Sequence, residues 1–185
     1  MTAGRNTQRA SAGGPRRGWR AWVLAGLLLV LVVANAGIWR NEAILRTGQV
    51  VLLQLAPVDP RSLMQGDYMA LRFALEAEIE AVLQRGGGGD QGREAPAPAY
   101  AVLAVDADRV ATFQRLQSGA VPLLDGEVAL RYEWRHGRVD VAPGAFFFEE
   151  GRGAYFAAAR YGELRIAPDG RALLSGLRDA DLAPL

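Results

Sequence analysis

The sequence predicts an α+β protein, with one N-terminal transmembrane helix followed by a mainly antiparallel β domain that carries one or two short helices. Two observations lead to this fold class. Residues 21–38 form an uncharged apolar run, and the rest of the chain alternates short Val- and Leu-rich segments with Gly, Pro and Asp turns. A chain of 185 residues, half of them hydrophobic, holds one modest domain in addition to an anchor.

The composition excludes several kinds of chemistry. There is no cysteine and no lysine, and the only histidine is His136. Structural disulfides, a thiolate nucleophile and a Cys-based zinc site are therefore absent, as is any mechanism that needs a neutral amine side chain. One histidine without cysteine also argues against zinc. We predict no metal and no cofactor.

The charge is unevenly distributed along the chain. From Asn41 onward there are 15 arginines against all 20 acidic residues, so this part carries a net charge of about −5, although the whole chain is at +1. A nucleic-acid-binding domain should instead be basic, and we predict no nucleic-acid partner. The segment before the apolar run is basic and contains no acid: its arginines are Arg5, Arg9, Arg16, Arg17 and Arg20.

The apolar run has the length of a membrane span. Bracketed by Trp19 and Trp39, it covers about 21 residues, or ~30 Å as a helix, which matches the hydrocarbon core of a bilayer. Indole rings favour the two interfaces of a membrane. We expect residues 19–40 to be an anchor in the lipid bilayer and residues 1–18 to be a basic cytoplasmic tail.

The arginine-rich tail also predicts the orientation, because positively charged flanks stay in the cytoplasm. The domain at 45–185 is then extracytoplasmic: in a Gram-negative cell, a single-pass inner-membrane protein with a periplasmic domain. A cleaved signal peptide is the alternative, since Ala34, Asn35 and Ala36 form a small-x-small cleavage site. Whether the anchor is retained or cleaved after Ala36 stays open, but both alternatives give the same compartment.

In the first half of the domain, residues 48–59 predict a strand that two prolines end. Residues 68–75 alternate as a second strand, and residues 76–85 have helical spacing. Residues 86–99 are rich in Gly and Pro and predict a flexible loop. The apolar face of the second strand consists of Met69, Leu71, Phe73 and Leu75.

The second half reads mainly as β structure. Residues 100–116 predict two strands around an Asp106–Asp108 turn, and residues 127–142 predict a hairpin. The remaining predicted elements are a short aromatic strand at 145–151, an amphipathic helix at 152–163 and a closing hairpin at 164–177 with Asp169-Gly170 at its tip.

The stretch "GDYMALRF" at 66–73 has the character of a structural corner. Gly66 accommodates a turn, Asp67 accepts hydrogen bonds from nearby backbone N–H groups, and Tyr68 suits the start of a strand. We predict that these three residues form the corner between antiparallel strands at 48–56 and 68–75.

The same stretch resembles the motif G-D-Y-x-x-L-x-Y of the GDYXXLXY family of membrane-anchored bacterial proteins. Gly66, Asp67, Tyr68 and Leu71 match, and Phe73 stands where the motif has Tyr. A second block at 146–174 is similar to the family as well. The resemblance implies a membrane-anchored domain without an assigned activity, often encoded beside multi-spanning membrane proteins, and it carries over no catalytic residues.

The remaining candidates for chemistry are carboxylates in the two blocks. They could converge as an acid/base pair or as a Ca²⁺ or Mg²⁺ site, although turns and helix ends select the same residues. Neither Ser62 nor His136 lies in a recognisable catalytic motif. The candidate carboxylates are Asp59, Asp67, Glu149 and Glu150.

These observations favour an accessory or interaction module of unknown activity that partners another membrane protein. The resemblance implies that this partner is a multi-spanning one. The alternative is a periplasmic hydrolase that depends on carboxylates or a metal. The sequence names neither a substrate nor a partner.

Overall fold

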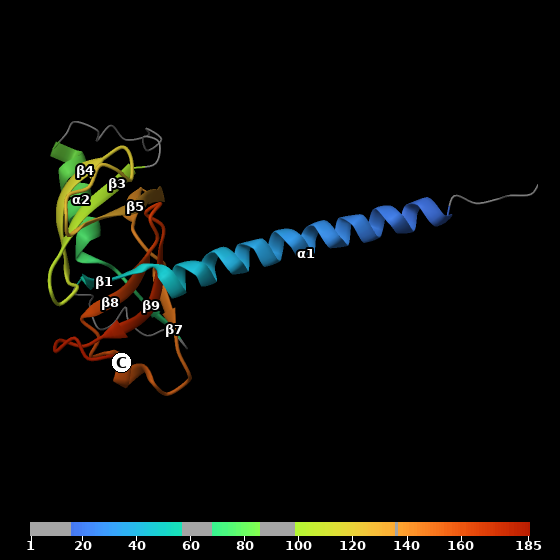
Figure 1. The fold of residues 1–185 in the computed structure, drawn as a ribbon. Helices are drawn as coiled ribbons and strands as arrows, with labels where there is room; N and C mark the ends of the chain where they lie inside the picture. The colour runs from blue at the N-terminus through green and yellow to red at the C-terminus, as the bar shows by residue number, and fades with distance from the viewer. Residues whose placement is uncertain (1–15, 57–67, 86–98, 136) are drawn as a thin grey trace, which may run out of the picture. The chain divides into compact units, whose positions relative to one another are not determined.

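The computed structural model describes residues 16–56, 68–85, 99–135 and 137–185. The chain divides into two compact units, Met1–Arg40 and Asn41–Leu185. The predicted fold class is confirmed: an N-terminal apolar helix is followed by antiparallel sheets and short helices (Figure 1).

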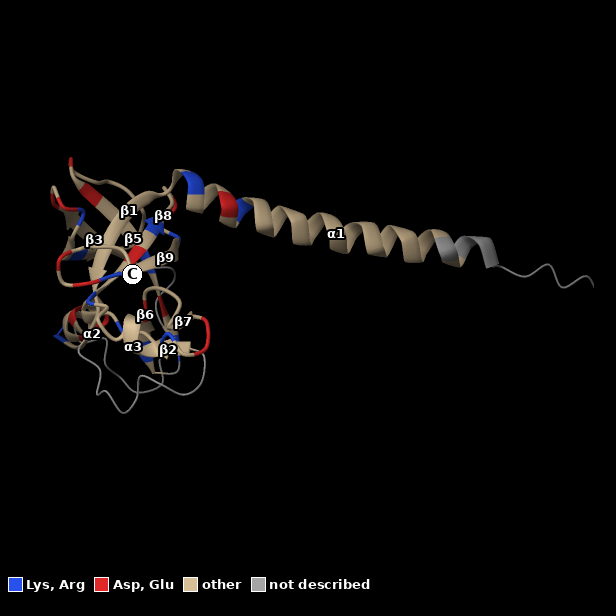
Figure 2. Ribbon diagram, turned by 90° about the horizontal axis from the view of Figure 1, so that it is seen from below, with Lys and Arg blue, Asp and Glu red and all other residues tan. Residues whose placement is uncertain are grey.

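Helix α1 spans Arg16–Thr47 and extends beyond the predicted anchor at 19–40. Among the described residues, its segment Ala21–Thr47 is the one helix long and apolar enough to cross a membrane, a property that signal sequences share. Asn35 lies in the apolar run, and its Nδ2 donates to the carbonyl oxygen of Leu31 at 2.8 Å. This bond within the helix satisfies the side-chain amide, for which lipid offers no hydrogen-bond partner. Charged residues follow near the helix end (Figure 2).

The first sheet has the strand order β1-β8-β9. Its strands are β1 (Gln49–Gln54), β8 (Tyr161–Ile166) and β9 (Ala172–Arg178), all antiparallel. The predicted hairpin is confirmed, because β8 and β9 pair antiparallel. Gly170 at its tip adopts a φ of +80°, a conformation that glycine tolerates best.

The predicted pairing of the strand at 48–56 with the strand at 68–75 is wrong. Strand β1 pairs along its whole length with β8 instead. Only a single antiparallel bridge joins the two predicted strands, between Leu55 and Phe73, next to a hydrogen bond of 2.8 Å from Ala56 N to Arg72 O. The corner itself, with Gly66 and Asp67, lies outside the described residues.

The second sheet has the order β4-β3-β5-β6. Its strands are β3 (Ala99–Val105), β4 (Ala111–Gln117), β5 (Glu127–Arg135) and β6 (Arg138–Asp140). The predicted Asp106 turn is confirmed: its Oδ1 accepts from the backbone N–H groups of Asp108 at 2.9 Å and Val110 at 2.8 Å. This side chain closes the turn between β3 and β4.

A two-stranded ribbon pairs β2 (Tyr68–Ala70) with β7 (Ala145–Phe147). The predicted strand at 68–75 therefore ends early, since helix α2 already begins at Ala74 and runs to Arg85. The predicted helix at 76–85 is thus confirmed and extended toward the N-terminus. Residues with high helix propensity, Ala and Leu among them, occupy the added turn.

The predicted helix at 152–163 is wrong. Helix α3 covers only Gly153–Phe156, and Tyr161–Glu163 belong to β8. Alanine propensity favours a helix there by only a fraction of a kcal/mol per residue. Pairing with both β1 and β9 outweighs it, because β8 is the central strand of its sheet.

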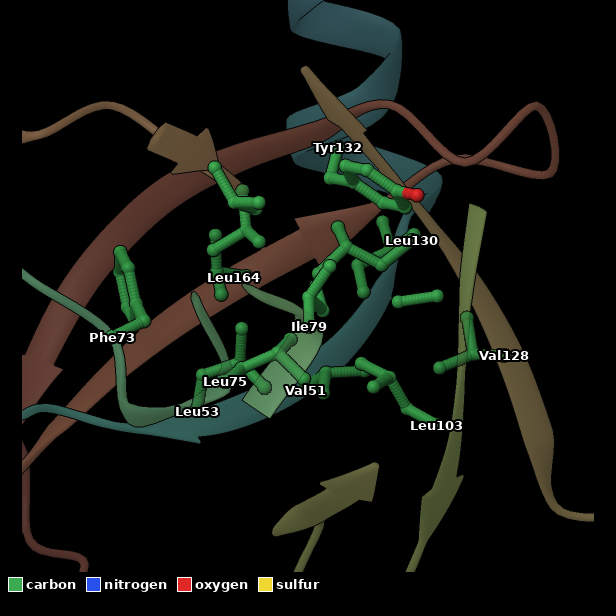
Figure 3. Packing of buried hydrophobic residues seen from close by; sticks show 14 residues of the cluster. Val51, Leu53, Phe73, Leu75, Ile79, Leu103, Val128, Leu130, Tyr132 and Leu164 are labelled. Carbon is green, nitrogen blue, oxygen red and sulfur yellow. The ribbon is translucent and has the colours of Figure 1, made fainter. Parts of the chain in front are cut away.

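Two clusters of buried side chains form the core. The main cluster lies between the two larger sheets and α2, where Phe73, Ile79, Leu103, Leu130 and Leu164 converge (Figure 3). The smaller cluster contains Met69, Leu71, Phe156, Ala159 and Leu177. Leu55 and Leu174 pack against both clusters and so connect them.

We expect Gly162→Ala to destabilise the domain by about 1–3 kcal/mol, since an added side chain in a packed core forces neighbours to shift. A Cβ at Gly162 would lie 2.7 Å from Cε1 of Phe73, whose ring is buried. Denaturant unfolding of the purified protein measures the effect. Gly176→Ala on the neighbouring strand is the matched control, because nothing lies within 4 Å of its Cβ. Equal midpoints for the two variants would show that the Phe73 contact is not tight.

Candidate functional site

The described part of the GDY stretch, residues 68–73, divides between the core and the surface. Phe73 is 2% exposed and belongs to the main cluster, and Leu71 is buried in the smaller one. Tyr68, by contrast, is 38% exposed at the start of β2. The motif thus fixes the chain in the core at one end and presents a tyrosine to solvent at the other.

Tyr68 faces an exposed phenylalanine across the ribbon. It stands directly opposite Phe147 in the register of β2 and β7, with ring centroids 5.8 Å apart and planes inclined at 42°. Phe147 is 75% exposed. We call Tyr68 and Phe147 the exposed aromatic pair. Cross-strand contacts between rings stabilise a ribbon by less than about 1 kcal/mol. This contact alone does not account for a phenylalanine ring that is so exposed.

The neighbours of Phe147 explain its position. Phe146 and Phe148 contact the buried ring of Phe156 at centroid distances of 5.2 and 5.1 Å. Successive side chains of a strand point to opposite faces. Because the rings on either side are held against Phe156, Phe147 is directed to the other face, where it meets Tyr68.

Helix α3 adds a cation–π contact beside this cluster. The guanidinium carbon of Arg152 lies 4.9 Å from the ring centroid of Tyr155 and 5.2 Å from that of Phe156. Such contacts are worth about 0.5–1 kcal/mol at exposed sites. Both contacts are local, because Arg152 is the N-cap residue of α3 and the two rings belong to α3 itself.

A pair of glutamates on α2 covers the outer edge of β6. Oε1 of Glu80 accepts from the backbone N–H of Val139 at 3.0 Å. Glu76, one turn earlier, is only 6% exposed and lies 3.8 Å from Nη1 of Arg72. An edge strand with free N–H groups invites pairing with other chains, and side chains that cover it prevent this.

Burial raises the pKa of Glu76 to about 6. The charge of Arg72 opposes the rise, the nearby carboxylate of Asp140 adds to it, and hydrogen bonding from the backbone of Phe73 and Val141 lowers the pKa again. The carboxyl group of Glu76 is therefore close to half protonated at mildly acidic pH.

Of the four carboxylates singled out in the sequence, the described part of the chain contains two. Glu149 and Glu150 are exposed in the turn after β7, and Asp59 and Asp67 lie outside the described residues. Among residues that the structure describes, no group of three or more His, Asp or Glu side chains is arranged to hold a metal ion. A pairing that involves Asp67 stays a prediction.

Sequence reasoning missed two residues of this region. Phe147 is the middle one of three consecutive phenylalanines. Alternation along a strand does not show which of the three side chains faces solvent. Glu76 was missed because it stands among other glutamates, although a glutamate in the first turn of a helix is a known capping signal.

The fold and this surface define a class of protein: an α+β domain that directly follows an apolar helix and presents an exposed aromatic pair on a short antiparallel ribbon. A family model described as GDYXXLXY protein matches residues 30–177. The chain therefore belongs to the GDYXXLXY family, as its motif predicted. No curated protein and no solved structure matches the chain.

The raised pKa of Glu76 predicts a pH dependence of stability. The folded state holds this proton more tightly than the unfolded chain, whose glutamate has a pKa near 4.5. The corresponding stabilisation is complete below pH 4.5 and decreases as pH rises through 6, by about 2 kcal/mol in total. Urea unfolding at pH 5 and pH 7 measures about 1 kcal/mol of this change, since part of it already occurs below pH 5. Glu76→Gln should reduce this difference, and Glu78→Gln, an exposed neighbour on α2, should leave it unchanged.

Proposed function

We propose that this protein is a membrane-anchored module whose domain lies on the periplasmic side of the inner membrane and binds another membrane protein. The apolar run of α1 at 21–38, in which every residue is exposed, supports the anchor. The arginines that precede this segment, with no acid among them, support a cytoplasmic N-terminus. The family match is consistent with an anchored module.

The observation that carries the binding role is the exposed aromatic pair. Phenylalanine and tyrosine rings bury a large area at low entropic cost, and aromatic residues are enriched among the residues that dominate binding energy. Phe147 leaves three quarters of its surface in solvent, while β2 and β7, which bring it against Tyr68, come from the two blocks that resemble the family. A partner held in the same membrane meets this surface without a search through the whole periplasm.

Substitution of Phe147 tests this role. We expect Phe147→Ala to weaken co-purification of the membrane partner by about tenfold or more, as loss of a central interface aromatic commonly does. The full chain is expressed in its native host, solubilised in mild detergent and quantified together with its bound proteins by mass spectrometry.

Trp134→Ala provides the matched control, since Trp134 is an aromatic residue of similar exposure to Tyr68, at 40%, on a different strand. This variant should retain the partner. If both variants recover every co-purifying protein equally, the exposed aromatic pair is not the surface that binds the partner.

The orientation is tested separately. Protease added to intact spheroplasts should remove a tag placed after Leu185 and spare a tag placed before Met1, because only the domain is exposed outside the cytoplasmic membrane. N-terminal sequencing of the membrane-bound chain distinguishes the two alternatives for α1. A new N-terminus at Gly37 would replace the anchor with a cleaved signal, and protection of the C-terminal tag would reverse the proposed topology.

A further inference from the structure

An open cleft of about 470 Å³ lies in the domain at 41–185, and neither residue of the exposed aromatic pair lines it. Strand β5 contributes Arg131, Glu133 and Arg135, which share one face because they alternate along the strand, while Leu130 and Tyr132 on the other face are buried. Strand β6 contributes Asp140, and the start of β9 adds the neighbouring Arg171. The cleft thus combines cationic and anionic side chains.

Most of these charges are already neutralised within the protein. Nε of Arg135 donates to Oε2 of Glu133 at 2.8 Å, and Nε of Arg171 donates to Oδ2 of Asp169 at 2.7 Å. Within the described part of the chain, the side chains of Arg131 and Asp140 are in no ion pair and in no hydrogen bond. One cation and one anion therefore remain available to a ligand.

The register of the sheet places these two residues close together. Asp140 stands directly opposite Glu133, so Arg131, two residues earlier on the same strand face, is its diagonal neighbour. The backbones of diagonal neighbours lie about 7–8 Å apart, so the two side chains reach the same part of the cleft. One ligand that carries both an anionic and a cationic group can therefore contact both.

We propose that the cleft binds a zwitterion composed of a phosphate group and an ammonium group. The guanidinium of Arg131 has the planar fork geometry that matches phosphate oxygens, and the carboxylate of Asp140 accepts hydrogen bonds from the ammonium.

The position of the cleft in the chain indicates the source of this ligand. Asn41 and Ile44 line it, and they follow the apolar run, which ends at Ile38, by three and six residues of the same helix. On the proposed anchoring, these residues reach the headgroup layer of the membrane, so the ligand is the headgroup of phosphatidylethanolamine. Free phosphoethanolamine carries the same chemistry and is the other source.

The test uses the full chain in mild detergent, titrated with short-chain phosphatidylethanolamine, with phosphatidylglycerol of equal chain length and with soluble phosphoethanolamine, each followed by native mass spectrometry. We expect phosphatidylethanolamine to bind more tightly than phosphatidylglycerol. Arg131→Gln should weaken its binding by about tenfold or more, since a charged hydrogen-bonding partner is lost. Asp140→Asn should weaken binding of phosphatidylethanolamine and leave phosphatidylglycerol unaffected.

Arg85→Gln and Asp108→Asn change exposed residues outside the cleft and should bind as the wild type does, and circular dichroism confirms that each variant is folded. If phosphoethanolamine binds as tightly as the lipid, the ligand is the free headgroup. If only the lipid binds, the ligand comes from the bilayer. Binding of soluble phosphoethanolamine does not depend on how the chain is anchored. A reversed topology together with unchanged phosphoethanolamine binding would therefore contradict the proposed function but not the cleft proposal.

Three results would overturn the cleft proposal. The first is that neither phosphatidylethanolamine nor phosphoethanolamine binds. The second is that Arg131→Gln binds them as tightly as the wild type. The third is that phosphatidylglycerol binds as tightly as phosphatidylethanolamine and Asp140→Asn changes neither affinity.

Discussion

The rest of the domain depends on the packing of one ring, Phe73, against the backbone of Gly162. This ring lies where β2 gives way to α2, and it contacts β8 at the one position of that strand without a side chain. Phe73 also bridges to Leu55 just after β1. Because interiors are packed as densely as organic crystals, this contact fixes the start of α2 against the sheet of β1, β8 and β9.

Helix α2 in turn covers the edge strand of the other sheet. Its glutamates meet β6, where Glu80 takes the backbone N–H of Val139 and Glu76 is buried beside Arg72. The arrangement satisfies backbone donors that an edge strand would otherwise leave to solvent or to another chain. Glu76, buried one turn before Glu80, has a pKa raised to about 6.

The two surfaces offered to ligands are consequences of strand pairing between distant segments. Tyr68 and Phe147 meet only because β2 pairs with β7. Arg131 and Asp140 become neighbours only because β5 and β6 form a tight antiparallel hairpin. In both cases the rigid ladder of backbone hydrogen bonds holds the side chains in place before any ligand arrives, which lowers the entropic cost of binding.

The sequence by itself determined the apolar helix, the β-rich domain, most hairpins and the family, since these depend on local patterns: an uncharged run, period-two alternation, turns at Asp106 and Gly170, and the GDY stretch. It did not determine that β1 pairs with β8 or that residues 161–163 form a strand. Local alanine propensity favoured a helix there, and only long-range pairing with β1 and β9 reversed it. The outward turn of Phe147 and the burial of Glu76 were likewise decided by tertiary packing, because the face that a residue presents depends on what the other segments cover.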